Sequence, residues 1–278
     1  MIDQIRPATA DDYPAYAMLF RELGVDDPTP GAERFAADLV PRTLIYERGG
    51  AAIGYVCYNN LAGRGYIQNL VVAPGARGGR IGEALMIAAA GALRAWGVTG
   101  EWNLNVKVDN APALRLYERL GLRAVYPMAV LRVAWANLDR LPVDPAPVTV
   151  APVADDDVDE LERVLGLLAG RLRLARSRTG RTTLQLRDGH GAPAGVACLD
   201  PGLGAFPFAV LRPGLAAPLL RGLAPHARPG DPALKIVIEH DDALSGALIA
   251  AGAEVNLRLM HYTGPLPPAK LERDGTAR

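Results

Sequence analysis

The stretch Leu70-Val-Val-Ala-Pro-Gly-Ala-Arg-Gly-Gly-Arg-Ile-Gly82 decides the fold of the first half of this chain. It opens with consecutive apolar residues, which predict the end of a strand. A turn rich in glycine and arginine follows, and apolar residues then recur at helical spacing as far as Trp96. This order of strand, turn and helix predicts an α/β fold for the first half.

The turn itself has the composition of a phosphate-binding loop. Its glycines leave backbone N–H groups open to a phosphate, and the start of a helix adds partial positive charge. Arg77 and Arg80 add full positive charges. Glycine-rich turns before helices also serve as tight connections without a ligand, so the turn alone leaves both interpretations open.

A second informative stretch is Leu104-Asn-Val-Lys-Val-Asp-Asn-Ala-Pro-Ala-Leu-Arg-Leu-Tyr-Glu-Arg-Leu-Gly121. Its first residues alternate as in a strand, and Asn110 can then cap a helix that Gly121 ends. By spacing alone, Tyr117 is a core aromatic on an amphipathic helix.

The two stretches together resemble the GNAT superfamily of CoA-dependent N-acetyltransferases. The family's phosphate signature, Gln/Arg-x-x-Gly-x-Gly/Ala, reads here Arg77-Gly-Gly-Arg-Ile-Gly82. Its later signature, Asn-x-x-Ala-x-x-Leu-Tyr-x-x-x-Gly-Phe, resembles the stretch from Asn110 to Leu122. The opening Ile5-Arg-Pro-Ala-Thr is also typical of the family. The resemblance covers residues 1 to about 135.

This resemblance implies a set of cofactor-binding residues for acetyl-CoA as co-substrate. Backbone groups of Leu70, Val71 and Val72 would pair with the pantetheine amides, in a gap where their strand splays from its neighbour. The pyrophosphate would be held by the turn of Arg77, Gly78, Gly79, Arg80, Ile81 and Gly82. Asn110 would hydrogen-bond the cofactor arm, and Tyr117 would protonate the departing thiolate.

The sequence departs from the family pattern in three respects. Arg80 stands where relatives usually have glycine, and Leu122 replaces the usual phenylalanine. Asn105 stands where some relatives carry a catalytic glutamate, and Tyr66 stands near another strand position where relatives place one, so the first half has no obvious carboxylate base. Base help is therefore expected from water or from an unrecognised residue. Asp26 and Asp27 could attract a cationic amine, or could simply form an acidic surface loop.

The second half looks like a degenerate copy of the first. Three phrases recur in order, beginning at Val150, Gly195 and Val237, with offsets of 145, 141 and 131 residues. The copy keeps one glycine and gains prolines in the counterpart of the phosphate turn, 211–219, and it has Leu248 in place of Tyr117. We expect it to be structural and without CoA, and we expect a fragment ending near Asp144 to bind CoA weakly.

Composition narrows the class of protein further. Lys plus Arg equals Asp plus Glu, 30 against 30, so no overall charge recruits nucleic acid or a membrane. Two cysteines and four scattered histidines predict no disulfide framework and no metal site. The chain shows no signal peptide and no stretch long enough to span a membrane, which predicts a cytoplasmic protein.

The sequence therefore predicts an α/β (α+β) protein of two tandem GNAT-like domains, each a mixed, mostly antiparallel sheet flanked by helices. Residues 1–140 would form the acetyl-CoA-binding acetyltransferase domain and residues 141–278 the degenerate one. The predicted activity is direct transfer of an acetyl group to a primary amine of a small molecule or peptide. Two alternatives stay open: a non-catalytic acyl-CoA sensor or partner-binding module, and a transferase with a longer acyl donor. The sequence leaves the oligomeric state open.

Overall fold

The computed structural model describes residues 3–269, and the chain divides into two compact units. The first comprises residues 1–125 and returns for residues 261–278; the second comprises residues 126–260. The predicted boundary at residues 140/141 differs from this division, because the chain leaves the first unit earlier and comes back to it at its end. Residues 1–2 and 270–278 of the predicted domains lie outside the described part.

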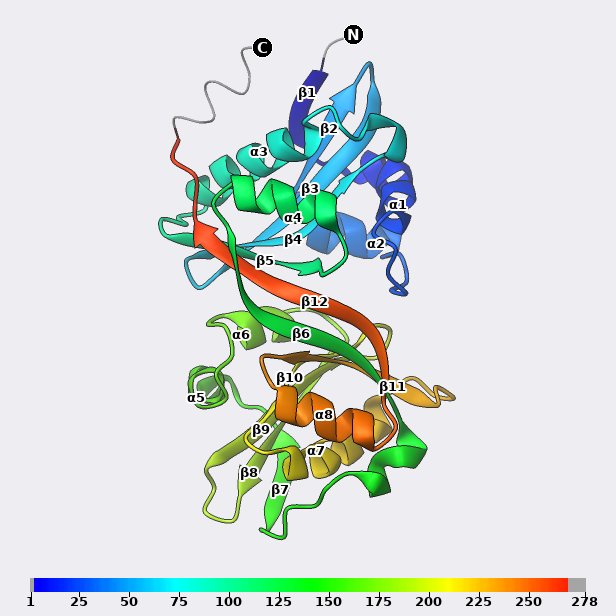
Figure 1. Cartoon of the computed structure of the whole chain (residues 1–278), viewed down its shortest axis with the longest axis vertical. Coiled ribbons are helices and arrows are strands. Elements are labelled where there is room, and N and C mark those ends of the chain that lie inside the picture. Colours follow the sequence, from blue (N-terminus) through cyan, green and yellow to red (C-terminus); the bar gives the residue numbers. More distant parts are fainter. Residues whose placement is uncertain (1–2, 270–278) are drawn as a thin grey trace. The chain divides into compact units, whose positions relative to one another are not determined.

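The first unit contains the strand, turn and helix predicted around residues 70–96 and the strand and helix predicted around residues 104–121, with ends shifted by a few residues (Figure 1). Its strands are β1 (Asp3–Pro7), β2 (Thr43–Arg48), β3 (Ala51–Leu61), β4 (Arg64–Val72) and β5 (Glu101–Lys107). Its helices are α1 (Tyr13–Arg21), α2 (Ala32–Arg34), α3 (Ile81–Ala95) and α4 (Ala111–Arg119). Short helical turns flank them: η1 (Ala10–Asp12), η2 (Phe35–Leu39), η3 (Val40–Arg42) and η4 (Pro74–Ala76).

These strands form a mixed sheet in the order β1-β2-β3-β4-β5, antiparallel except for the parallel pair β4–β5. Helices pack on both faces of this sheet. Tyr16 and Phe20 of α1 pack with Tyr55 of β3 in one buried cluster. On the other face, a Cβ atom at Gly54 of β3 would touch Leu85 of α3 at 3.2 Å.

The last strand of the chain completes this sheet. β12 runs over Glu254–Pro265, and its final residues, 261–265, belong to the first unit, where they lie beside β5 (Figure 1). Thr263 Oγ1 donates to the carbonyl of Trp102, and the backbone N–H of Leu266 donates to that of Gly100. Only glycine fits at position 264, since a Cβ there would lie 2.5 Å from the carbonyl oxygen of Gly121.

The second unit repeats the element order of the first. Its elements are β6 (Arg123–Ala134, which begins in the first unit), η5 (Trp135–Arg140), β7 (Val148–Pro152), η6 (Asp155–Asp157), α5 (Val158–Val164), α6 (Arg171–Arg176), β8 (Thr182–Asp188), β9 (Pro193–Asp200), β10 (Gly204–Val210), η7 (Pro213–Leu215), α7 (Ala216–Leu223), η8 (Ala224–His226), β11 (Ala233–Glu239) and α8 (Asp242–Ala250). Their sheet has the order β7-β8-β9-β10-β11-β6, again antiparallel except for the pair β10–β11.

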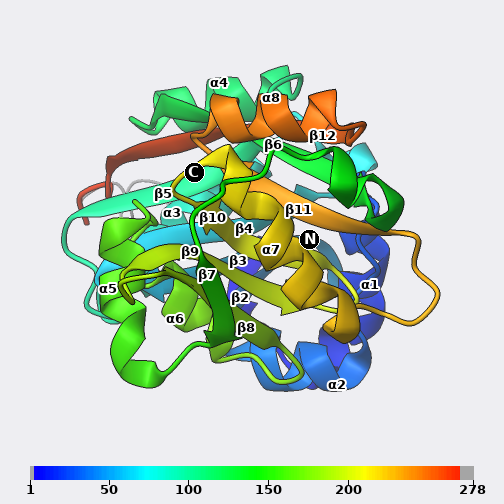
Figure 2. The same ribbon diagram turned by 90° about the horizontal axis from the view of Figure 1, so that it is seen from below.

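Alternate residues of β9 face opposite layers of the second unit. Ala197 and Leu199 join the cluster that contains α7, which packs on β7, β8 and β9 (Figure 2). Val196 and Cys198 join the cluster of α5 and α6. Each unit is therefore a mixed, mostly antiparallel sheet flanked by helices, which confirms the predicted fold class.

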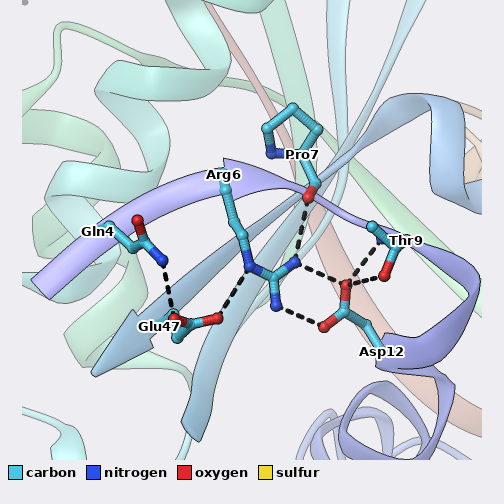
Figure 3. A network of polar contacts seen from close by, with 6 residues as sticks. All are labelled: Gln4, Arg6, Pro7, Thr9, Asp12 and Glu47. Carbon is cyan, nitrogen blue, oxygen red and sulfur yellow. Dashed lines mark hydrogen bonds and ion pairs between the residues drawn. The ribbon is translucent and has the colours of Figure 1, made fainter. Parts of the chain in front are cut away.

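A partly buried ion pair fixes the start of the first helix (Figure 3). Arg6 of β1 donates to both oxygens of Asp12, at 2.8 and 2.7 Å, and its Nε donates to Glu47 of β2 at 2.9 Å. Asp12 also accepts from the backbone N–H of Thr9. The Arg6 guanidinium holds the pKa of the Asp12 carboxyl below its usual value.

The second unit has a similar ion pair, in which the carboxylate occupies the equivalent position but the arginine comes from a different strand. Asp157, 145 residues after Asp12, pairs with Arg187 of β8 at 2.8 Å and accepts from Gln185 at 2.6 Å. Arg187 lies 140 residues after Glu47, so β8 is the counterpart of β2. The arginine of the pair is therefore on the second strand of this unit, whereas Arg6 is on the first strand of the other. Packing at the helix start has therefore been retained in both copies.

Candidate active site

A gap opens between two neighbouring strands of the first unit. The parallel ladder joins Gly65 with Trp102, Tyr66 with Asn103 and Ile67 with Leu104. Past that last pair, β4 continues to Val72 and β5 to Lys107 with no further pairing between them in the described part. The backbone of residues 70–72 therefore has an edge available to an extended ligand.

A β-bulge lies at the point where the ladder ends. The register between β3 and β4 passes from Cys57–Asn69 to Tyr58–Ile67, so Gln68 is an extra residue on β4. A bulge bends its strand and increases the local twist. It accounts for the divergence of β4 from β5 beyond Ile67.

The glycine- and arginine-rich turn connects β4 to the start of α3. Gly78 has φ +84° and Arg80 has φ +56°, so the backbone turns through the left-handed region twice before Ile81. This conformation explains why glycine would be favoured at position 80. The first helical hydrogen bond runs from Ala84 N to Arg80 O at 3.0 Å, so earlier N–H groups point out of the helix end.

The other side chains of the turn are placed by contacts within the same unit. Arg77 donates to the carbonyl of Val72 at 3.1 Å and pairs with Glu22, which follows α1, at 3.0 Å. Gly82 lies against α4, since a Cβ at that position would be 3.3 Å from Leu116 Cδ2. The start of α3 and the helix α4 are thus packed closely beside the turn.

The two predicted residues of the second motif lie at the start and near the end of α4. Asn110 caps the helix, with its Oδ1 accepting from the backbone N–H of Ala113 at 3.3 Å. Tyr117 is 7% exposed, and burial raises the pKa of its hydroxyl, so that it stays protonated at neutral pH. Both positions agree with the capping and core interpretations of the sequence.

Three side chains, those of Tyr66, Asn105 and His261, are linked by hydrogen bonds at the point where the pairing between β4 and β5 ends. Asn105, the first residue of β5 past the last pair, donates from Nδ2 to the hydroxyl of Tyr66 at 3.4 Å. Its Oδ1 lies 2.7 Å from Nδ1 of His261, which is 3% exposed. Sequence reasoning found Asn105 and Tyr66 but missed His261, because 156 residues separate it from Asn105.

Hydrogen bonds connect the loop after α1 to the last residue of β5. Lys107 donates from Nζ to the carbonyls of Leu23, at 2.9 Å, and Gly24. Asp26 and Asp27 follow directly in this loop, where Asp26 is exposed and Asp27 half-buried. The acidic loop therefore lies near the end of the strand that carries Asn105.

In the second unit, the counterpart of the phosphate turn is covered by its own chain. Asp144 donates from its backbone N–H to the carbonyl of Gly214 at 3.1 Å, and its carboxylate pairs with Arg212 at 2.8 Å. A Cβ at Gly214 would lie 2.8 Å from Asp144 N. The counterparts of Asn110 and Tyr117 are Asp241, a helix cap at 2.8 Å from Leu244 N, and the fully buried Leu248.

The described residues hold no group of three or more His, Cys, Asp or Glu side chains arranged to bind a metal ion. Over the same residues, no helix is both long enough and apolar enough to cross a membrane.

Comparisons with known proteins agree with the motifs of the first unit. Residues 6–122 match the acetyltransferase (GNAT) family. Over 123 residues the chain is 37% identical to streptothricin acetyltransferase of Streptomyces lavendulae. That match spans 42% of this chain and 61% of the relative.

Solved structures resemble the whole chain in fold. A GCN5-related N-acetyltransferase from Sphaerobacter thermophilus aligns over 96% of both chains, with a TM-score of 0.64 and 18% identity. A putative acetyltransferase from Pyrococcus horikoshii aligns over 97% of this chain and 90% of its own, with a TM-score of 0.70 and 16% identity. A tandem GNAT protein of the clavulanic acid biosynthesis pathway aligns over 96% and 100%, with a TM-score of 0.61 and 18% identity.

Proposed function

We propose that the first unit, whose residues 6–122 match the acetyltransferase (GNAT) family, transfers an acetyl group from acetyl-CoA to a primary amine. One observation carries the proposal: the gap between β4 and β5 leads directly to the left-handed turn at Gly78 and Arg80. The gap supplies an unpaired strand edge, and the turn supplies N–H groups and the positive end of α3.

In this proposal, acetyl-CoA follows this path and meets the chain's residues in sequence order. Backbone groups of Leu70, Val71 and Val72 pair with the pantetheine amides, and a backbone N–H near Val72 polarises the thioester oxygen. The turn 77–82 takes the pyrophosphate, which draws Arg77 away from the exposed carboxylate of Glu22. Asn110 contacts the cofactor arm while it caps α4.

Tyr117 acts as the general acid in this proposal. Its hydroxyl is protonated because burial raises its pKa, and a dry site lets the proton move a short distance to the departing thiolate. The amine attacks the thioester directly, since neither motif places a nucleophile. Cys57, the thiol of this unit, is 1% exposed within β3.

The acceptor is a small-molecule or peptide amine that enters near the acidic loop of Asp26 and Asp27. The name of the relative makes streptothricin the first acceptor to try. The second unit binds no CoA, because Asp144 lies on the turn around Gly214. An acetyl-CoA-dependent activity implies a cytoplasmic protein.

A turnover assay tests this proposal. Purified protein with acetyl-CoA is offered streptothricin, L-lysine, spermidine and a peptide with an N-terminal alanine, and both CoA thiol and acetylated product are measured. Acetylation of at least one amine supports an enzyme. Tight acetyl-CoA binding with no product from any amine supports the acyl-CoA sensor instead, and faster transfer from butyryl-CoA supports a longer acyl donor.

A further inference from the structure

The first unit lacks a carboxylate at the two positions where a base was expected, Asn105 and Tyr66. The structure brings a histidine to one of them. His261 Nδ1 lies 2.7 Å from Asn105 Oδ1, and the Asn105 amide donates on its other side to Tyr66. Imidazole can take a proton near neutral pH, which neither a carboxamide nor a neutral tyrosine can do.

We propose that His261, carried into the first unit by the last strand of the chain, is the base that accepts a proton from the acceptor amine. This inference rests on the proposed acetyltransferase function. Asn105 is its positioning residue, and it lies at the first position of β5 past the paired part of the ladder. Asn105 and Tyr66 are half-buried and border the gap, and the buried His261 lies within hydrogen-bonding distance of Asn105.

The hydrogen bond to Asn105 selects the imidazole tautomer. Because the Asn105 amide donates to Tyr66, its Oδ1 faces His261 and accepts the Nδ1–H. The lone pair is then on Nε2, the atom that can receive a proton directly or through one water. A catalytic histidine is likewise accompanied by an asparagine in papain-like proteases.

Protons and bonds balance in the resulting step. The ammonium form of the acceptor gives one proton to His261 Nε2, and the free amine nitrogen bonds to the thioester carbon. The carbon–sulfur bond breaks, and the thiolate takes the proton of Tyr117. After the attack the nitrogen carries two protons. One of them passes to the Tyr117 oxygen and restores its hydroxyl, which leaves the neutral amide, and His261 releases its own proton to water.

The last strand is held in place by bonds that do not involve the imidazole. Arg94 of α3 donates to the carbonyl of Pro267, and the hydroxyl of Tyr262 donates to Oε1 of Glu118 of α4 at 3.4 Å. A change at His261 therefore leaves several anchors intact. The titratable side chains on the first-unit elements around His261 are Arg64 and Tyr66 of β4, Glu101 and Lys107 of β5, Arg115, Tyr117, Glu118 and Arg119 of α4, Arg123 of β6, and Tyr262 of β12 itself.

The experiment compares the full-length wild type with His261→Asn, whose amide can still donate to Asn105 but cannot titrate. We expect unchanged acetyl-CoA affinity and unfolding temperature, and a kcat about a hundredfold lower at neutral pH with the best amine of the panel. The difference in kcat between His261→Asn and the wild type should shrink as the pH approaches the pKa of the amine, because the amine is then already deprotonated and needs no base. A kcat within twofold of wild type would overturn the inference.

A spectroscopic measurement keeps the test independent of turnover and of the folding of one variant. Long-range nitrogen–proton NMR of the wild type, with the His261 signals assigned by their loss in His261→Asn, should show the Nδ1–H tautomer. Asn105→Leu removes the acceptor from a half-buried position, and it should abolish that preference and lower kcat about tenfold. An Nε2–H tautomer in the wild type contradicts the inference even if the protein is an acetyltransferase. A wild type that binds acetyl-CoA but acetylates no amine overturns the proposed function, and the base role with it.

Discussion

Arg6 and Asp12 form a two-pronged ion pair in which both carboxylate oxygens of Asp12 accept from the guanidinium, at 2.7 and 2.8 Å. The Asp12 side chain is 9% exposed and the Arg6 side chain 30%. The pair ties β1 to the turn that begins α1, and α1 covers one face of the sheet. It therefore gives the first unit a measurable dependence on pH.

Asp12→Asn should lower the free energy of unfolding at neutral pH by about 2 kcal/mol, the size of a hydrogen bond to a charged group. Arg6 lowers the pKa of Asp12 in the folded state, so this stability is present above the ordinary carboxyl pKa and is lost as the pH falls through the lowered one. The difference in the free energy of unfolding between Asp12→Asn and the wild type should thus shrink in acid. Urea unfolding followed by tryptophan fluorescence measures it, with Asp11→Asn at an exposed neighbouring carboxylate as the control. Equal effects of the two substitutions would contradict the account.

Tyr117→Phe keeps the buried ring and removes only the hydroxyl. If Tyr117 is the general acid, kcat should fall about a hundredfold while acetyl-CoA affinity stays the same. Leu116→Ala on the same helix is the control, because it removes a side chain that packs on Gly82 and has no proton to give. Wild-type kcat in Tyr117→Phe would mean that the residue is only part of the core, or that thiolate release does not limit turnover.

The return of β12 to the first unit changes what a truncated chain should do. A fragment of residues 1–144 lacks residues 261–267, and with them the bonds of Thr263 to Trp102 and of Leu266 to Gly100. We now expect this fragment to lose CoA binding and to unfold more easily than the full chain, rather than to keep weak binding. Calorimetry and thermal unfolding measure this. Adding residues 145–278 as a separate chain should restore part of the affinity, and a fragment that binds as tightly as the full chain would contradict the structure.

Local patterns predicted the strand, turn and helix around Arg77–Gly82 and the strand and helix that follow, because each is encoded within a few neighbouring residues. The cap at Asn110 and the helix end at Gly121 follow from their own side chains in the same way. The bulge at Gln68 gives no such signal, since it depends on pairing between two strands. Neither His261 beside Asn105 nor Asp144 on Gly214 could be predicted, because each depends on contacts between residues far apart in the chain.

The central claim is that one acetyl-CoA binds per chain, through the turn before α3. Gly79→Asp tests it better than a change at Gly82, because a Cβ at Gly79 meets only the carbonyl of Ala76 at 3.6 Å, whereas a Cβ at Gly82 presses on Leu116. Gly100→Asp adds the same charge where a Cβ meets nothing within 4 Å, and it serves as the matched control.

Titration calorimetry of acetyl-CoA into the full-length protein is the most direct measurement of this claim. The account predicts one site per chain in the wild type and in Gly100→Asp, and an affinity at least about tenfold weaker in Gly79→Asp, a loss of about 1.4 kcal/mol. Two equivalent sites per chain, or an unchanged affinity in Gly79→Asp, would contradict it.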